Sequence, residues 1–416
     1  MKVAVLGAGV TGVTTAYYLA KHGYEVTVYD RQALPAEETT FANGGQISVS
    51  QPFPWSSPDL PMKLLKWIGR KDAPLVFKLQ ADPKMWAWSL KFLSNARSSI
   101  FYKNSEKILK LALHSQSCLE ALLETETLTF DRQQRGILKL FNGEQDAAHS
   151  SELAKWLNDN GVSQRMLSRA EVLEIEPALS DATSPFSGGT FSPNDESGDA
   201  HKFAIELEAA ARRIGVVFKY NATIEGFENS AAHVHSVRVN GKAVKFDKFV
   251  LCTGSYSANL ASKLNIKLPV YPVKGYSVSI PIEGDNNAPL TSITDETNHV
   301  VISRLGNTLR AAGTAEVNGY SLTPNKDRED LVLDAVMKLF PDVGDPAKAT
   351  RWSGLRPMSA DSVPIIGSTK LENFYLNTGH GHLGWTLSCG SAQILAAHIV
   401  GEATNLDISA YNVDRF

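Results

Sequence analysis

The feature that most constrains this chain is a glycine-rich turn near its start, set between an apolar run and a helical pattern. Residues 2–6 read KVAVL and are followed at once by GAGVTG. Short apolar, β-branched runs of this kind are typical of strands buried in a parallel sheet. A helical pattern then continues to Gly23, and YEVTVYD at 24–30 predicts a second strand. Together these segments predict one strand–helix–strand unit.

The three glycines of the turn have separate physical uses. Gly7 permits the tight turn, Gly9 lets the backbone approach a pyrophosphate, and Gly12 lets the helix pack closely on the strand. The helix N-terminus stabilises negative charge placed there. Asp30 ends the second strand, 18 positions after Gly12, where a carboxylate can accept hydrogen bonds from a ribose. We therefore predict a dinucleotide-binding site.

Two later segments favour FAD over NAD as the dinucleotide. VLCTGS at 250–255 is a strand that runs into a turn of small residues, which includes Thr253 and Gly254. NTGHGHLGWT at 377–386 is a second glycine-rich turn between a strand and a helix. A helix N-terminus there can stabilise the negative charge of a reduced flavin. Arg31 would suit a 2′-phosphate, but Asp30 beside it would repel one.

Charge and cysteine content exclude several other classes of protein. The chain has 416 residues, with 41 Lys and Arg against 44 Asp and Glu, and this balance argues against nucleic-acid binding. Three widely spaced cysteines predict neither a disulfide framework nor a metal site, and they favour a reducing, cytoplasmic location. Asp195, Glu196 and Asp199 are interpreted as a loop and a helix cap, because no His or Cys stands near to complete a metal site.

The order of these segments predicts an α/β chain, α+β overall, with a Rossmann-like FAD-binding domain and an inserted, mostly antiparallel substrate or cap domain. The FAD-binding domain is predicted to be discontinuous and to comprise 1–50, 195–268 and 352–416. The substrate domain is predicted to comprise 51–194 and 269–351. No apolar stretch reaches the roughly 18 residues that a membrane-spanning helix needs.

Seven segments carry a resemblance to a known family. In order, they are GAGVTG with Asp30, FANGGQIS, PNDESGDA, CTGSYS, PVYPVKGYS, GLRPMSADSVPIIG and NTGHGHLGWTLSCGSAQ. They resemble the D-amino-acid oxidase and glycine oxidase superfamily, and most closely the bacterial D-amino-acid dehydrogenases. The resemblance runs essentially end to end. It implies an FAD domain and an antiparallel substrate domain, with the flavin ring at their interface.

The glycine-rich turns and the resemblance together predict a set of cofactor contacts. Hydroxyl contacts to phosphate are expected from the two threonines at 39 and 40. The predicted set is Gly7, Gly9, Val10, Thr11, Gly12, Asp30, Arg31, Thr39, Thr40, Asn43, Gly44, Gly45, Gln46, Thr253, Gly254, Gly381, His382, Leu383 and Gly384.

The resemblance also implies substrate contacts. Arg356 matches the family's arginine that binds the substrate carboxylate, and a guanidinium can hold a carboxylate with two parallel hydrogen bonds. Tyr271 and Tyr276 lie on the strand expected to line the pocket. Five positions separate them, so they should face opposite sides, and Tyr276 is preferred. His380 is a candidate for contacting the flavin or moving protons, as is His382, although either could simply satisfy local backbone groups.

The activity implied by the resemblance is oxidative deamination of small D-amino acids to 2-oxo acids and ammonia. The α-hydrogen would pass as hydride to flavin N5, and the electrons would go on to a quinone or another respiratory-chain acceptor. Three alternatives remain open at this point: an oxygen-using oxidase on the same fold, a flavoprotein subunit that needs a partner, and an NAD-linked dehydrogenase, which the flavin-side segments disfavour. The oligomeric state is not predicted.

The segment at 61–79 bears on membrane contact, because it mixes apolar and basic residues. Leu64, Leu65 and Ile68 share one face of a predicted helix. Its basic residues are Lys63, Lys66, Arg70, Lys71 and Lys78. A basic amphipathic helix can lie on an anionic membrane, whereas the alternative is a core-facing helix with a solvated basic side. The resemblance favours peripheral contact with the inner face of the cytoplasmic membrane.

Overall fold

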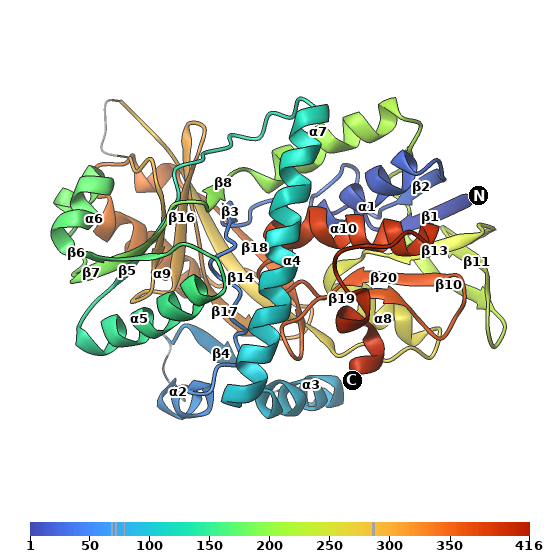
Figure 1. Cartoon of the computed structure of the whole chain (residues 1–416), viewed down its shortest axis with the longest axis horizontal. Coiled ribbons are helices and arrows are strands. Elements are labelled where there is room, and N and C mark those ends of the chain that lie inside the picture. Colours follow the sequence, from blue (N-terminus) through green and yellow to red (C-terminus); the bar gives the residue numbers. More distant parts are fainter. Residues whose placement is uncertain (68–69, 71–72, 79, 285–287) are drawn as a thin grey trace.

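The computed structural model describes residues 1–67, 70, 73–78, 80–284 and 288–416. Figure 1 shows a parallel sheet on one side and a larger mixed sheet on the other, with the long helix α4 (Ser98–Thr125) running between them. Each half contains both helices and strands, which confirms the predicted α/β fold class. Within the described ranges, no helix is both long and apolar enough to cross a bilayer.

The parallel sheet contains the predicted strand–helix–strand unit. Its strand order is β19 (Ile365–Ser368), β20 (Phe374–Thr378), β13 (Lys248–Leu251), β1 (Lys2–Leu6), β2 (Glu25–Tyr29) and β9 (Val217–Lys219). All neighbours in this order pair in parallel except β19, which is antiparallel to β20. The carboxyl ends of β1, β13 and β20 therefore lie at one edge, where nucleotide-binding folds place their ligands.

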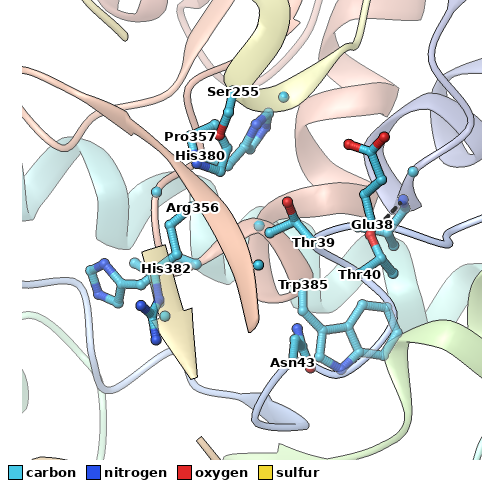
Figure 2. A pocket seen from close by; sticks show the side chains of 18 of the residues that line it. Glu38, Thr39, Thr40, Asn43, Ser255, Arg356, Pro357, His380, His382 and Trp385 are labelled. Atoms are coloured by element: carbon cyan, nitrogen blue, oxygen red, sulfur yellow. Dashed lines mark hydrogen bonds between the residues drawn. The ribbon is translucent and has the colours of Figure 1, made fainter. Parts of the chain in front are cut away.

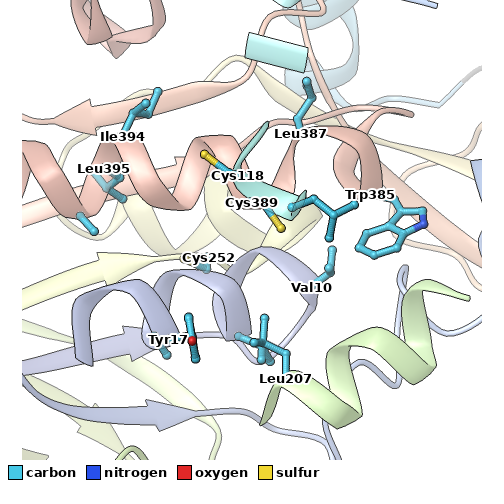
Figure 3. Packing of buried hydrophobic residues seen from close by; sticks show 14 of the residues in the cluster. Val10, Tyr17, Cys118, Leu207, Cys252, Trp385, Leu387, Cys389, Ile394 and Leu395 are labelled. Atoms are coloured by element: carbon cyan, nitrogen blue, oxygen red, sulfur yellow. The ribbon is translucent and has the colours of Figure 1, made fainter. Parts of the chain in front are cut away.

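Helices cover the parallel sheet with small and apolar side chains. α1 (Val10–Lys21) packs against α10 (Gly384–Val400), and α10 packs against α4. Figure 3 shows Val10, Trp385 and Leu395 in this core, together with Leu207 from α7 (Ala200–Arg213). The three cysteines are free and buried.

The mixed sheet is mostly antiparallel. Its order is β18 (Thr350–Ser359), β14 (Val270–Pro281), β17 (Thr308–Val317), β16 (Val300–Leu305), β15 (Ser292–Asp295), β5 (Ile137–Phe141), β7 (Gly188–Ser192) and β6 (Arg165–Ser168), with β4 (Leu75–Phe77) paired to β17. α9 (Lys326–Leu339) covers one face, where Val332 and Val336 pack with Val278 and Ile280. The other face of β14, β17 and β18 is turned toward the parallel sheet.

Smaller elements complete the chain. They are α2 (Leu60–Trp67), α3 (Pro83–Ser94), α5 (Glu144–Asp159), α6 (Arg169–Ile175), α8 (Ser257–Ser262), β3 (Gln46–Ile47), β8 (Glu196–Ser197), β10 (Ile224–Asn229), β11 (Val234–Val239) and β12 (Lys242–Val244). Asp199 caps α7 as expected, because its side chain accepts hydrogen bonds from the backbone N–H groups of His201 and Lys202. One predicted domain boundary needs correction: residue 352 falls inside β18, which belongs to the mixed sheet as far as Ser359.

The contact between α10 and α4 yields a stability prediction. A Cβ at Gly390 would lie 2.7 Å from the backbone Cα of Ser115, closer than atoms can approach. Gly390→Ala should therefore lower the free energy of unfolding by about 1–3 kcal/mol, although alanine favours helix. Urea unfolding measures this change. Gly226→Ala is the control, since its nearest neighbour would lie 3.6 Å away. Equal stability of the two variants would contradict the prediction.

Candidate active site

A cavity of about 720 Å³ lies between the two sheets, and residues of both halves line it. Figure 2 shows part of its wall. Of the predicted cofactor positions, the lining includes Gly7, Gly9, Val10, Thr11, Asp30, Arg31, Thr39, Thr40, Asn43, Gly44, Gly45, Gln46, Thr253, Gly254, Gly381, His382, Leu383 and Gly384. Gly12 does not line the cavity. A Cβ there would lie 1.9 Å from the carbonyl oxygen of Gly7, so its use is the close packing of α1 on the turn.

The glycine-rich turn is held by hydrogen bonds from its backbone. The N–H of Ala8 donates to Oδ2 of Asp30 at 2.6 Å, and the N–H of Val10 donates to Oγ1 of Thr40 at 3.2 Å. Gly7 has φ +108°, a conformation that favours glycine. Asp30 therefore supports the turn in addition to lining the cavity. Burial raises the pKa of this carboxyl group.

Two helix N-termini open into the same cavity, and neither N-cap residue caps its helix with its own side chain, although Thr40 accepts from the first N–H of α1. α1 begins after Gly9 and α10 begins after Leu383, and neither helix has an acidic residue in its first turn. Their free N–H groups and dipoles favour negative charge at both points. The residues present thus fit a group that carries a pyrophosphate at one end and a flavin ring at the other.

Several lining side chains are already engaged within the protein. The hydroxyl of Thr39 donates to the carbonyl oxygen of Leu355 at 2.7 Å, so its hydrogen is not available to a phosphate, contrary to the expected contact. Thr40 accepts from Val10 and keeps its hydroxyl hydrogen. Arg31 pairs with Glu38 at 2.5 Å, and its guanidinium lies 3.8 Å from the centre of the Tyr256 ring.

Arg356 on β18 points into the cavity beside backbone and aromatic groups (Figure 2). Its Nη1 donates to the carbonyl oxygen of Thr314 at 3.3 Å, and its guanidinium carbon lies 5.5 Å from the centre of the Trp55 ring. Among the described residues, no carboxylate lies within ion-pair distance of this guanidinium. Burial lowers its pKa to about 10, so it remains a cation at neutral pH.

The two tyrosines predicted to contact substrate require correction. Tyr271 does not line the cavity, because its ring packs on Trp88 and its hydroxyl donates to Oδ2 of Asp82 at 2.8 Å. Tyr276 contributes to the wall, but its hydroxyl donates to Oε2 of Glu316 at 2.7 Å and its ring packs in the core beneath α9. The hydroxyls of both are used inside the protein.

The two histidines of the second turn differ in their surroundings. His380 is buried, and its Nε2 lies 3.1 Å from Oγ of Ser391 on α10. His382 stacks on Trp55, with 5.2 Å between ring centres and 24° between planes. Burial lowers the pKa of each ring to about 3, and the charge of Arg356 adds to this effect at His382. Both imidazoles are therefore neutral at physiological pH.

The sequence prediction missed several residues of the wall around Arg356. Trp55 comes from an irregular stretch rich in Pro and Ser, where no periodicity indicates which way a side chain points. Gly275 lies on β14, and a Cβ there would meet Nη1 of Arg356 at 1.9 Å. Trp352 lies four positions and Gly354 two positions before Arg356, on the same face of β18. A glycine followed by Tyr in a strand pattern was the available signal for a close approach.

Comparison with known proteins gives consistent matches. A family model described as FAD dependent oxidoreductase matches residues 2–398. The chain is 45% identical over 417 residues to a D-amino acid dehydrogenase of Paramagnetospirillum magneticum, and the alignment covers 100% of this chain and 99% of that protein. A D-amino acid dehydrogenase of Bradyrhizobium diazoefficiens is 42% identical over 416 residues, with 100% and 99% covered. The crystal structure of glycine oxidase from Geobacillus kaustophilus has the same fold, with a TM-score of 0.78 and 22% sequence identity. The match covers 100% of this chain and 98% of that one.

The neutral histidines predict how stability depends on pH. Below about pH 6.5 the unfolded chain takes up a proton at each histidine, whereas folded His380 resists protonation until about pH 3. Stability from this source is complete above pH 6.5 and falls as the pH drops, by up to about 1.4 kcal/mol per pH unit. His380→Asn should make this fall shallower in denaturant unfolding of the holoenzyme between pH 7 and 5. The exposed His235→Asn variant serves as control, and identical slopes for all three proteins would refute the prediction.

Proposed function

Because this chain belongs to the family of FAD-dependent oxidoreductases, we propose that it oxidatively deaminates a small D-amino acid and passes the electrons to a quinone. The family match confirms the predicted FAD cofactor and enzyme class. The names of the two similar proteins support a D-amino acid as the substrate. The proposal covers the substrate's chirality and the electron acceptor, and it assigns roles to residues of the cavity.

One observation carries the proposal: the half-buried guanidinium of Arg356 faces the cavity with no carboxylate partner among the described residues. Removing a charge from water costs free energy unless an opposite charge or strong hydrogen bonds compensate it. The carbonyl of Thr314 and the face of Trp55 compensate Arg356 only in part. A ligand carboxylate would complete the pair, with two parallel hydrogen bonds that fix the position of its α-carbon.

The cavity residues divide between the cofactor and the substrate. Gly7, Gly9 and Thr11 at the start of α1 would hold the pyrophosphate of FAD, while Gly381 and Gly384 at the start of α10 would lie against the flavin. When bound, FAD supplies the acceptor for the hydride that leaves the substrate's α-carbon. The protein's part is to bind the carboxylate, to orient the α-carbon and to exclude water.

Two indole rings flank the carboxylate-binding arginine and support a small substrate side chain. Trp55 lies on one side of Arg356, and Trp352 lies on the same face of β18 with its ring folded over Gly354. A bulky side chain on the substrate would compete with these rings for the same space. The rings also exclude water from the guanidinium, which strengthens its interaction with a carboxylate.

The first experiment is anaerobic mixing of the purified holoenzyme with paired D- and L-amino acids. Bleaching of the flavin absorbance by small D-amino acids, but not by their L-enantiomers, is expected. Rapid reoxidation by a water-soluble quinone and slow reoxidation by oxygen would support the dehydrogenase proposal over an oxidase. Bleaching by neither enantiomer of any amino acid tested, with FAD bound, would refute the substrate class.

Arg356→Gln should selectively impair substrate use. Removing one partner of a buried charge pair costs about 2–5 kcal/mol, so kcat/KM should fall by roughly 30-fold or more. Arg356→Lys keeps the charge but loses the planar guanidinium that can donate two parallel hydrogen bonds. Its kcat/KM should therefore lie between those of Arg356→Gln and wild type. FAD content and unfolding should remain close to wild type. The exposed Arg135→Gln variant is the control, and a wild-type kcat/KM for Arg356→Gln would refute the assignment.

An apolar and basic surface on α2 and α3 supports contact with a membrane that holds the quinone. The two helices share a buried side, where Leu60 packs with Met85 and Trp88. Their outer side exposes large apolar residues, which is unlike the solvated basic side of an ordinary core-facing helix. These are Met62 (62% exposed), Leu65 (64%), Trp86 (48%), Leu90 (70%) and Leu93 (37%).

Basic residues accompany this apolar surface and suit an anionic bilayer. Lys63 and Lys66 lie on α2, and Lys84 and Lys91 lie on α3. Ile68 and Lys71, which were part of the predicted membrane-binding segment, lie outside the described residues. Leu60, Lys63 and Trp67 of α2 also line the cavity, so the proposed membrane surface adjoins the redox site. We propose that the enzyme docks here on the inner face of the cytoplasmic membrane.

Flotation with lipid vesicles tests the docking surface. Wild type should float with vesicles that contain phosphatidylglycerol and much less with pure phosphatidylcholine. A Leu65→Ser/Leu90→Ser double variant should lose at least about tenfold in partitioning, since each leucine contributes roughly 1.5–3 kcal/mol on burial. Leu322→Ser is the control, because Leu322 is 47% exposed but lies outside the two helices. Undiminished flotation of the double variant would exclude this surface.

A further inference from the structure

His382 lies beside the carboxylate-binding arginine with its ring turned to the cavity. Its ring stacks on Trp55, and the guanidinium of Arg356 lies over the same indole. Figure 2 shows the side chains of Arg356 and His382 near each other. The two groups thus share one neighbour in the cavity wall. A substrate whose carboxylate is held by Arg356 would carry its α-nitrogen a few ångströms from that carboxylate, within the space that these groups enclose.

His382 and His299 are the histidines of the wall with unused hydrogen-bonding capacity among the described residues. In the part of the chain that the structure describes, neither ring nitrogen of His382 bonds to a protein group, whereas His380 is bonded to Ser391. Among the carboxylates of the wall, Glu38 pairs with Arg31 and Glu296 pairs with Lys139. The wall carboxylate Glu37 lies 3.4 Å from the ring of His201. Asp30 accepts the hydrogen bond from the turn already described.

The remaining candidate, His299, belongs to a different part of the wall. It lies beside Trp67 of α2, with 6.4 Å between ring centres. The charged groups that act on it are led by Glu296 and Lys63, and Arg356 is not among them. Proximity to the carboxylate site therefore selects His382 over His299.

We propose that His382 accepts a proton from the α-ammonium group of the bound substrate, an inference that rests on the proposed amino-acid oxidation. One N–H bond of the ammonium breaks, and a new N–H bond forms on the imidazole. The electron pair of the broken bond stays on the substrate nitrogen, which becomes a neutral amine. That lone pair can stabilise the positive charge that develops at the α-carbon as its hydrogen leaves with two electrons. The proton passes from the imidazolium to solvent after product release.

The charges around His382 suit this role. Before substrate binds, burial and then the charge of Arg356 keep the imidazole neutral and able to accept a proton. Arg356, on β18, is the charged group among the described residues that acts on the ring, and Trp55 on the facing loop is uncharged. A bound carboxylate offsets the charge of Arg356 and so removes the smaller of the two causes that lower the pKa of His382, while the effect of burial stays. Carboxylate binding therefore makes the histidine a stronger base when the ammonium arrives.

The pH dependence of flavin reduction in His382→Asn tests the proposal. Asparagine keeps a polar side chain but cannot take up the proton. Anaerobic reduction by a D-amino acid, measured per bound FAD, should be about 100-fold slower than wild type at pH 7. The deficit should shrink as the pH rises, because the free substrate then already contains neutral amine. His382→Gln provides a second variant should the asparagine variant bind FAD poorly, and the exposed His235→Asn should keep the wild-type profile.

The outcomes distinguish failure of the role proposed for His382 from failure of the proposed amino-acid oxidation. Reduction of the His382→Asn flavin at the wild-type rate, or a deficit that is equal at every pH, would overturn the role of His382 alone. A wild-type flavin that no amino acid reduces would overturn the proposed function together with this inference.

A binding measurement gives a second readout that needs no turnover. Propionate has the carboxylate but lacks the amine, so its binding should raise the pKa of His382 without supplying a proton. Calorimetry at pH 5 in buffers of different ionisation enthalpy should show more proton uptake on binding to wild type than to His382→Asn, in which only the ionisation of propionic acid itself contributes. Equal proton uptake by both proteins would overturn the coupling between Arg356 and His382.

Discussion

A backbone contact too close for any side chain organises the nucleotide-binding end of this protein. A Cβ on Gly12 would meet the carbonyl oxygen of Gly7 at 1.9 Å, and one on Gly7 would meet the carbonyl oxygen of Cys252 at 2.6 Å. β1, α1 and the end of β13 therefore come together through backbone atoms. This closeness brings the N-terminus of α1 to the edge of the sheet, where its unpaired N–H groups face the cavity. Larger residues here would move the helix away from the phosphate that it has to bind.

The substrate side depends in a similar way on backbone geometry, now in the mixed sheet. Arg356 is opposite Val273 in the pairing of β18 with β14, and Gly354 is opposite Gly275, so glycines clear the space beside the guanidinium. The pairing of β14 with β17 has a register shift between Lys274 and Tyr276. On β17 in this stretch, Thr314 has φ +50°, which is strained for a β-branched residue. Its carbonyl accepts a hydrogen bond from Arg356. Bulges that redirect groups are common beside active sites.

Local patterns predicted the parts of this site that depend on neighbouring residues in the chain. The glycine turn, the helix cap at Asp199 and the second turn before α10 each follow from a few consecutive positions. Strand alternation also correctly indicated that Tyr271 and Tyr276 face opposite sides. It could not indicate which face meets the cavity, because β17 and β18 decide that and they lie far along the chain. Trp55 escaped prediction for the same reason, since its position depends on contacts with His382 rather than on its own irregular segment.

Burial and the distribution of charge in the cavity together explain why its histidines are neutral. Two helix N-termini and Arg356 contribute positive potential to one enclosed space, and the lining carboxylates considered above are already bonded within the protein. Such a cavity stabilises anions, while burial lowers the pKa of both His380 and His382, and the charge of Arg356 adds to this effect at His382. An amino acid enters with one charge of each sign. In the proposed reaction its carboxylate offsets the charge of Arg356, which removes part of the penalty on a cation at His382, so carboxylate binding and transfer of the ammonium proton are coupled through these two side chains.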